Sequence, residues 1–190
     1  MRIKAPALGS GTVSQVAANA RALSNAIHRA PVQPLAGPKE RQQPMYKHIL
    51  VATDGSELSE RASRHAIALA KLHGSKITAI TVTAPWSAVA IGEIAVAVPE
   101  QEYETRAENN AWRDLNQVVD AAKAADVPRN AIHLRNTQPY RAIVEAAEKE
   151  MCDLIVMGSH GRRGLEGFLL GSETHKVLTH TKVPVLVYRD

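Results

Sequence analysis

The chain has 190 residues, 45% of them hydrophobic and 22% charged, a composition ordinary for a globular protein with a sizeable core. Its formal net charge of +4 is unevenly spread, because residues 1–44 hold six Lys or Arg against one Glu, whereas the remainder holds 17 against 18 Asp or Glu. The main part therefore lacks the basic excess of a nucleic-acid-binding domain, and no apolar run of about 18 residues predicts a membrane span, so we expect neither partner.

The first 44 residues form a separate segment. They are rich in Ala, Ser, Pro and Arg, and four prolines lead into the rest of the chain. Such a composition buries too little apolar area to offset the entropy of ordering, which predicts a disordered extension. Two other interpretations stay open: an organelle transit peptide, or translation that starts at Met45. We expect a second unit, the folded domain, over residues 45–190.

From Met45 on, short apolar runs alternate with helical patterns, which predicts an α/β fold with a parallel sheet covered by helices on both faces. The expected strands are Lys47–Ala52, Lys76–Val82, Ala131–Arg135, Leu154–Met157 and Val185–Tyr188. The expected helices are Glu57–Leu72, Gln101–Ala125, Tyr140–Glu150 and Ser172–Thr179. Ser56 is expected to cap the first helix and Gly74 to end it.

Two further features of the domain limit its chemistry. The chain's one cysteine, Cys152, excludes an intramolecular disulfide and a cysteine-based zinc site, and it fits a reducing compartment. We therefore expect a cytoplasmic protein in which Cys152 is a small buried hydrophobe. The histidines show no metal-ligand spacing, so no metal site made by the protein is expected. The apolar stretch Ala84–Val98 is long for a crossover, which suggests a flap over a ligand or a dimer contact.

The most informative motif follows the strand that ends at Met157. It reads GSHGRRGLEGFLLGS from Gly158 to Ser172, with glycines that can take positive φ or allow close approach of a ligand. Ser172 is expected to be the N-cap of the next helix, so that backbone N–H groups and the helix dipole face an anion. The motif lacks the Gly-Lys of a P-loop and the Gly-x-Gly of a dinucleotide fold. A phosphate site of another kind is predicted.

The motif Gly158-x2-Gly161-x9-Gly171-Ser172, together with MYKHILVATDGSELSERA from Met45 and VPVLVYR from Val183, resembles the ATP-binding branch of the universal stress protein family. The resemblance covers nearly everything after residue 44. It implies an open Rossmann-like sheet of order 3-2-1-4-5 and bound ATP. We expect Mg²⁺ with the ATP, because the triphosphate itself implies the ion, whereas no cluster of protein carboxylates does. One departure from the family pattern is Thr137-Gln138-Pro139, where Gly-x-Pro is common.

The resemblance also implies the residues that bind the nucleotide. It assigns the phosphates to the backbone around the motif's glycines and Gly-Ser pair, and it implies that Asp54 and Val82 lie against the ribose and adenine. The expected binding set is Asp54, Val82, Met157, Gly158, Gly161, Gly171 and Ser172. A homodimer through the last strand, Val183 to Tyr188, is implied as well, and an apolar strand at a sheet edge favours such pairing.

Three functions remain open from the sequence. The first is a regulatory module for stress response that binds ATP without efficient turnover. The second is a slow ATP-hydrolysing or phosphate-transferring enzyme that uses Asp54, His160 or Ser172, with Arg162 and Arg163 as charge donors. The third is an interaction protein of the same fold that needs no nucleotide. We expect no catalytic residues, because no carboxylate is placed by sequence to orient His160.

Overall fold

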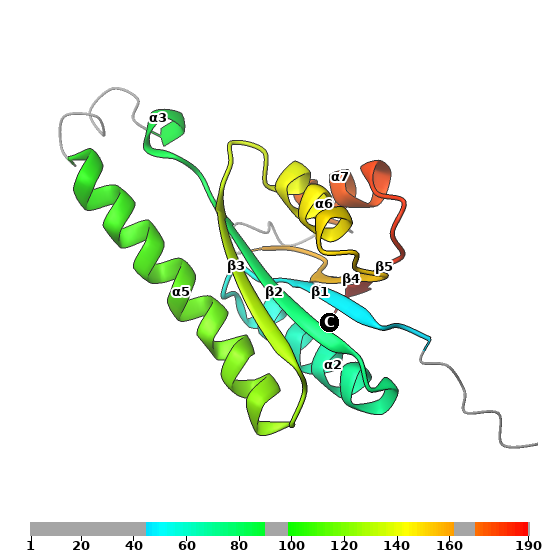
Figure 1. Cartoon of the computed structure of the whole chain (residues 1–190). Helices are drawn as coiled ribbons and strands as arrows, with labels where there is room; N and C mark the ends of the chain where they lie inside the picture. The colour runs from blue at the N-terminus through cyan, green and yellow to red at the C-terminus, as the bar shows by residue number, and fades with distance from the viewer. Residues whose placement is uncertain (1–44, 90–98, 162–169, 190) are drawn as a thin grey trace, which may run out of the picture. The chain divides into compact units, whose positions relative to one another are not determined.

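The computed structural model describes residues 45–89, 99–161 and 170–189. Its centre is a five-stranded sheet in the order β3-β2-β1-β4-β5, in which every neighbouring pair is parallel (Figure 1). The strands are β1 His48–Ala52, β2 Lys76–Thr83, β3 Arg129–Arg135, β4 Leu154–Gly158 and β5 Val185–Tyr188. The helices are α2 Glu57–His73, α3 Trp86–Val89, α5 Glu100–Ala124, α6 Pro139–Lys149 and α7 Ser172–His180. The fold class and strand order expected from the sequence are confirmed.

The sheet separates two apolar layers. Helices α2 and α5 pack on one face, where Val51 and Val156 of the central strands meet Leu115 of α5. Helices α6 and α7 cover the other face, where Leu50 and Ile155 meet apolar side chains of α6. Because β1 and β4 are buried on both faces, they are apolar at almost every position instead of alternating.

Helix α2 begins and ends where its sequence predicts. The Ser56 hydroxyl accepts a hydrogen bond from the Ser59 N–H at 3.3 Å, so it satisfies one of the unpaired N–H groups of the first turn. Gly74 ends the helix in the left-handed region at φ 69°, where it has no Cβ to oppose that conformation. This helix leads directly away from the loop after β1 and so fixes the position of Asp54.

The structure corrects some expected boundaries. β3 begins at Arg129, two residues before the predicted start, because Arg129 and Asn130 pair with β2 through their backbones while their side chains are exposed. Within the apolar stretch Ala84–Val98, for which a flap or a dimer contact was expected, residues 86–89 form the short helix α3, and residues 90–98 lie outside the described residues. The extension of residues 1–44 also lies outside them, so its predicted disorder stays a prediction.

Candidate functional site

The carboxyl ends of β1 and β4 bring the two predicted motifs together. The strands are neighbours, with Val51 opposite Val156, and Asp54 follows one strand as Gly161 follows the other. A Cβ built on Gly161 would lie only 2.6 Å from Oδ2 of Asp54. The aspartate and the glycine loop therefore meet in space, at the point of an open α/β sheet where ligands bind.

Asp54 is held firmly at this point. Its Oδ1 accepts hydrogen bonds from the Ser56 hydroxyl at 2.7 Å and from the Ser56 N–H at 3.1 Å. Gly55, between them, takes φ 72°, a conformation that favours glycine. The Asp-Gly-Ser sequence thus forms the turn, caps α2 through Ser56, and turns one oxygen of Asp54 toward the glycine loop.

The described glycines of the motif, Gly158, Gly161 and Gly171, lie close to other atoms of the protein and do not have positive φ. Gly55 and Gly74 are the glycines with positive φ in the described ranges, and the motif's glycines are not among them. A Cβ on Gly158 would lie 3.1 Å from the carbonyl oxygen of His160, and one on Gly171 would lie 3.1 Å from that of Ser159. Positive φ is thus excluded at these three positions, and the close approach that the geometry shows is that of the protein's own atoms; close approach of a ligand stays a prediction.

The start of α7 differs by one residue from the expected one. Gly171 is the N-cap, with φ −70° and ψ 155°, and Ser172 is the first helical residue, so the prediction that Ser172 caps the helix is wrong. The carbonyl of Gly171 accepts the first helical hydrogen bond, from the His175 N–H at 2.9 Å. The N–H groups of Ser172, Glu173 and Thr174 have no acceptor within the helix, and the positive end of the dipole lies there. The first turn of α7 is chemically suited to an anion.

Two contacts fasten this turn to the loop after β4. The Gly171 N–H donates to the carbonyl of Ser159 at 2.8 Å, and the Thr174 hydroxyl donates to the carbonyl of Gly158 at 3.0 Å. Ser159 and Thr174 are each 3% exposed. The start of the glycine loop and its end are therefore joined, although thirteen positions separate Gly158 from Gly171.

Val82 and Met157 lie on the α6 and α7 side of the sheet. Met157 is 6% exposed and belongs to the apolar layer there, and Val82 packs against the same layer. Val82 is on β2 and Met157 on β4, so the two residues flank β1 from opposite sides near its carboxyl end. They can supply an apolar wall, and their predicted contact with a base stays a prediction.

His160 packs inside the loop. Its Nδ1 lies 3.1 Å from the Ser159 hydroxyl, and its ring edge is 3.6 Å from where a Cβ of Gly171 would be. Its Nε2 is buried without a hydrogen-bond partner in the described part of the chain. These contacts favour the packing role over a catalytic one. Arg162 and Arg163 lie outside the described residues.

Sequence reasoning missed Glu173. Its Oε2 accepts a hydrogen bond from the Tyr140 N–H of α6 at 2.9 Å, and its Oε1 lies 2.8 Å from Nζ of Lys176. This bond raises the pKa of Lys176, whose ammonium also lies 5.5 Å from the centre of the Tyr140 ring. No local motif connects positions 33 residues apart, so only the packing of α6 beside α7 shows the contact.

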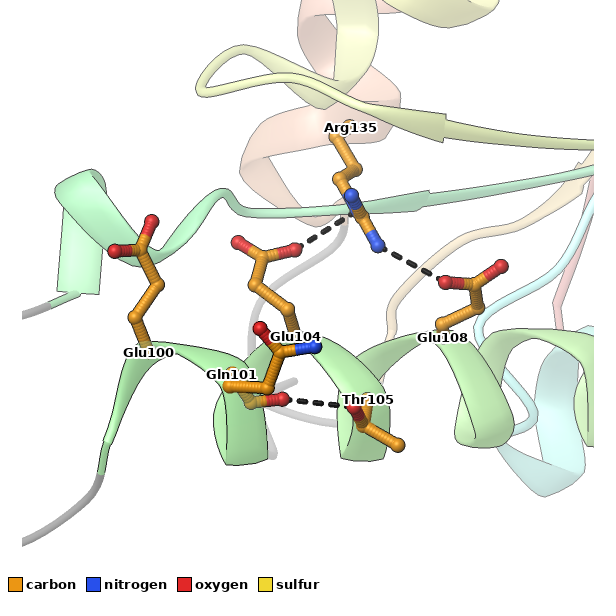
Figure 2. Close-up of a pocket in the computed structure, with 6 residues that line it drawn as sticks. All are labelled: Glu100, Gln101, Glu104, Thr105, Glu108 and Arg135. Carbon is orange, nitrogen blue, oxygen red and sulfur yellow. Dashed lines mark hydrogen bonds and ion pairs between the residues drawn. The ribbon is translucent and has the colours of Figure 1, made fainter.

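A second polar group lies at the β3 edge of the sheet. Figure 2 shows Arg135 between Glu104 and Glu108 of α5. Its Nε lies 2.9 Å from Oε2 of Glu104, and its Nη2 lies 3.1 Å from Oε2 of Glu108. Nearby, His133 has its pKa lowered by burial and then by Arg135, and its Nε2 lies 2.8 Å from the Thr83 hydroxyl. The guanidinium already pairs with the carboxylates here, so we interpret the group as structural.

The described ranges also bear on the expectations for a metal site, a membrane span and Cys152. They contain no group of three or more His, Cys, Asp or Glu residues placed to hold a metal ion, and no helix long and apolar enough to cross a membrane. Cys152 is buried, as expected, and burial raises the pKa of its thiol to about 12. The thiol therefore stays protonated and unreactive at neutral pH.

The profile of the universal stress protein family matches residues 45–189. The chain belongs to this family. Universal stress protein MJ0531 of Methanocaldococcus jannaschii is 35% identical over 147 residues, which cover 76% of this chain and 83% of that protein. A universal stress protein of Thermus aquaticus is 33% identical over 149 residues, covering 76% of this chain and all of that protein.

Solved structures agree with this assignment. The structure of MJ0577, a universal stress protein of M. jannaschii, superposes with a TM-score of 0.66 at 29% identity, covering 77% of this chain and 97% of the other. A universal stress protein solved in complex with cAMP gives a TM-score of 0.55 at 27% identity, with 76% and 97% covered. The resemblance read from the glycine motif is thereby confirmed at the level of the family.

Proposed function

We propose that this universal stress protein domain binds ATP at the carboxyl ends of β1 and β4 and acts as a regulatory module in stress response. The observation that carries the proposal is the meeting of Asp54 with Gly161 beside the first turn of α7. That turn offers backbone N–H groups and the positive end of a helix dipole to phosphates, the groups that carry the negative charge of a nucleotide. The relative solved with cAMP supports an adenine nucleotide as the ligand class.

The proposed contacts divide the ligand among the elements. Phosphates lie against Gly158, Gly161 and the start of α7 from Gly171 and Ser172 onward, where backbone N–H groups are available. Asp54 accepts hydrogen bonds from the ribose hydroxyls, a usual role for an acidic residue after a strand of such a sheet. Val82 and Met157 supply apolar surface to the adenine. Mg²⁺ enters with the triphosphate, whose oxygens are its preferred ligands.

The domain is proposed to bind ATP without efficient hydrolysis. Fast phosphoryl transfer needs a positioned nucleophile, a held metal and charge stabilisation of the transferring group. In the described residues the Nε2 of His160 is not oriented by a carboxylate, and Asp54 is engaged with Ser56. We expect turnover far below the ~1 to 100 per second of dedicated kinases.

The decisive experiment is mass spectrometry of small molecules released from the denatured, purified protein, followed by phosphate-release kinetics with saturating Mg·ATP. ATP recovered from the protein and turnover below about one per second support the regulatory binder. Faster turnover that His160→Ala abolishes would make the protein an enzyme. Absence of nucleotide, together with no ATP binding in calorimetry, would favour the nucleotide-independent interaction protein.

We also propose that two copies pair through β5. This strand is an edge strand of the sheet. An apolar groove runs between β5 and α2, and its lining includes Leu69, Leu72 and Leu186. Leu186 is 38% exposed and Leu72 78%. An apolar edge strand that offers free backbone groups favours pairing with a second copy, which would cover these side chains.

A further inference from the structure

Helix α7 carries an acidic residue where the proposed ligand is most negative. Glu173 is the second residue of α7, so its carboxylate lies in the same turn as the N–H groups assigned to phosphate. A negative charge there opposes a triphosphate, because like charges repel at short range. Phosphate binding alone therefore gives no reason for a glutamate at this position.

The hydrogen bonds of Glu173 supply a reason. Pro139 is the first residue of α6 and has no N–H, and Gln138 makes no side-chain cap, so the Tyr140 N–H is the first donor that α6 offers. Oε2 of Glu173 accepts this donor at 2.9 Å and acts as the missing cap from another helix. Because the carboxylate is occupied by Tyr140 and Lys176, much of its charge is compensated before a ligand arrives.

This bond completes a three-point attachment of the phosphate-binding turn. Gly171 and Thr174 fasten the turn to Ser159 and Gly158 in the loop after β4, and Glu173 fastens it to α6. Helix α7 has nine residues, about two and a half turns, so it has little stability of its own. Three attachments to two neighbouring elements, the loop after β4 and α6, fix where its first N–H groups point.

We propose that Glu173 is a positioning residue that orients the first turn of α7 for phosphate through its hydrogen bond to the Tyr140 N–H. The inference rests on the proposed ATP site and adds a residue that the glycine motif does not contain. A donor array held in place before binding loses less entropy when the ligand arrives, so the bond raises affinity without touching the ligand. Its effect acts on the phosphates and not on the adenosine part of the nucleotide.

The test compares two substitutions. Glu173→Gln removes the charge but keeps an oxygen that can accept from Tyr140, whereas Glu173→Ala removes both. The ratio of their Kd values for ATP therefore isolates the hydrogen bond from the charge. We expect Glu173→Ala to bind ATP about tenfold more weakly than Glu173→Gln, equivalent to about 1.4 kcal/mol, while adenosine affinities stay equal. Glu145→Ala is the control, because Glu145 is an exposed α6 glutamate paired with Arg141 of its own helix.

The outcomes separate the two proposals. If wild type binds ATP and the two Glu173 variants bind it equally, the positioning role is wrong and the ATP site stands. Equal losses for ATP and adenosine would mean general loosening of the domain, which also overturns the positioning role. If wild type binds no ATP, the proposed function fails and this inference fails with it. Faster amide hydrogen exchange at Tyr140 in Glu173→Ala, restored in Glu173→Gln, is expected alongside.

Discussion

Gly161→Ala tests whether the glycine loop and Asp54 share one site. The new Cβ would lie 2.6 Å from Oδ2 of Asp54, closer than real carbon and oxygen atoms approach, so one of the two must move. The carboxylate is the more movable partner, but moving it strains or breaks its hydrogen bonds to the Ser56 hydroxyl and N–H. Hydrogen bonds to a charged group contribute about 1.5–3 kcal/mol each, and water replaces part of this at a half-buried site.

We therefore expect Gly161→Ala to cost about 2 kcal/mol of unfolding free energy, which lowers Tm by about 4–8 °C for a domain of this size. ATP affinity should fall more than ~10-fold, since both the aspartate and the loop are displaced. Differential scanning calorimetry and titration calorimetry measure the two effects.

A double-mutant cycle decides the cause of the loss. In an Asp54→Ala background the Cβ introduced by Gly161→Ala meets no carboxylate, so the additional loss of Tm should nearly vanish. An undiminished cost of Gly161→Ala in that background would refute the reasoning, because the clash would then lie elsewhere. A folded Gly161→Ala protein with wild-type affinity for ATP would remove the loop from the proposed site.

Four further predictions concern the rest of the domain. His48 is 3% exposed, and its pKa is lowered first by burial and then by the positive charge of Lys76, so the folded state resists protonation of its ring. The free energy of unfolding should therefore be highest above about pH 6.5 and fall as the pH drops below that value. Equal free energies from urea unfolding at about pH 7.5 and about pH 5.5 would contradict this. Met151 has φ 54° and is 83% exposed, so Met151→Gly should stabilise the protein by about 0.5–1 kcal/mol in the same assay, and a loss of stability would show that the methionine contributes packing. Leu186→Lys on β5 should shift the mass measured by light scattering from dimer to monomer, whereas Leu178→Lys on α7, of similar exposure at 41% against 38%, should not; a dimer that survives Leu186→Lys would place the interface elsewhere. A chain that starts at Met45 should melt within a degree or two of the full chain, and a loss of several degrees would show that residues 1–44 contribute to the fold.

Much of the fold could be predicted because local chemistry and tertiary structure agree in this chain. The buried strands β1 and β4 are continuous apolar runs, and Ser56 and Gly74 carry ordinary cap chemistry. The start of β3 could not be read, since Arg129 and Asn130 pair through backbone groups that every residue possesses. Side-chain patterns report burial, so a strand with exposed ends looks shorter in sequence than it is.

The candidate site was predictable where its residues are glycines or turn formers, and not where they act across helices. Asp54 and the glycine loop each follow a predicted strand, and the order 3-2-1-4-5 implied by the resemblance makes those two strands neighbours, as the observed register of β1 and β4 does. The start of α7 depends on whether Gly171 or Ser172 is the last residue with extended φ and ψ before the helix begins. Both residues tolerate extended and helical dihedral angles, so the sequence alone could not decide, and the structure shows that Gly171 is the extended one. The role of Glu173 could not be predicted, because its partner is the backbone N–H of Tyr140 on α6, and a backbone group leaves no pattern in the sequence.

The described glycines of the motif make room for other atoms of the protein itself. The space beside Gly161 is taken by Asp54, that beside Gly158 by His160 and Leu58, and that beside Gly171 by Ser159 and His160. A glycine substitution therefore disturbs the loop before it disturbs a nucleotide, and lost binding alone would not separate the two causes. Glu173 is in the first turn of α7, but its carboxylate bonds to α6 and Lys176 instead of the loop, and its oxygen can be kept or removed without adding bulk to the loop. For this reason the comparison of Gln with Ala at position 173 tests how the first turn of α7 is oriented for phosphate, without the steric clash that accompanies a change at Gly158, Gly161 or Gly171.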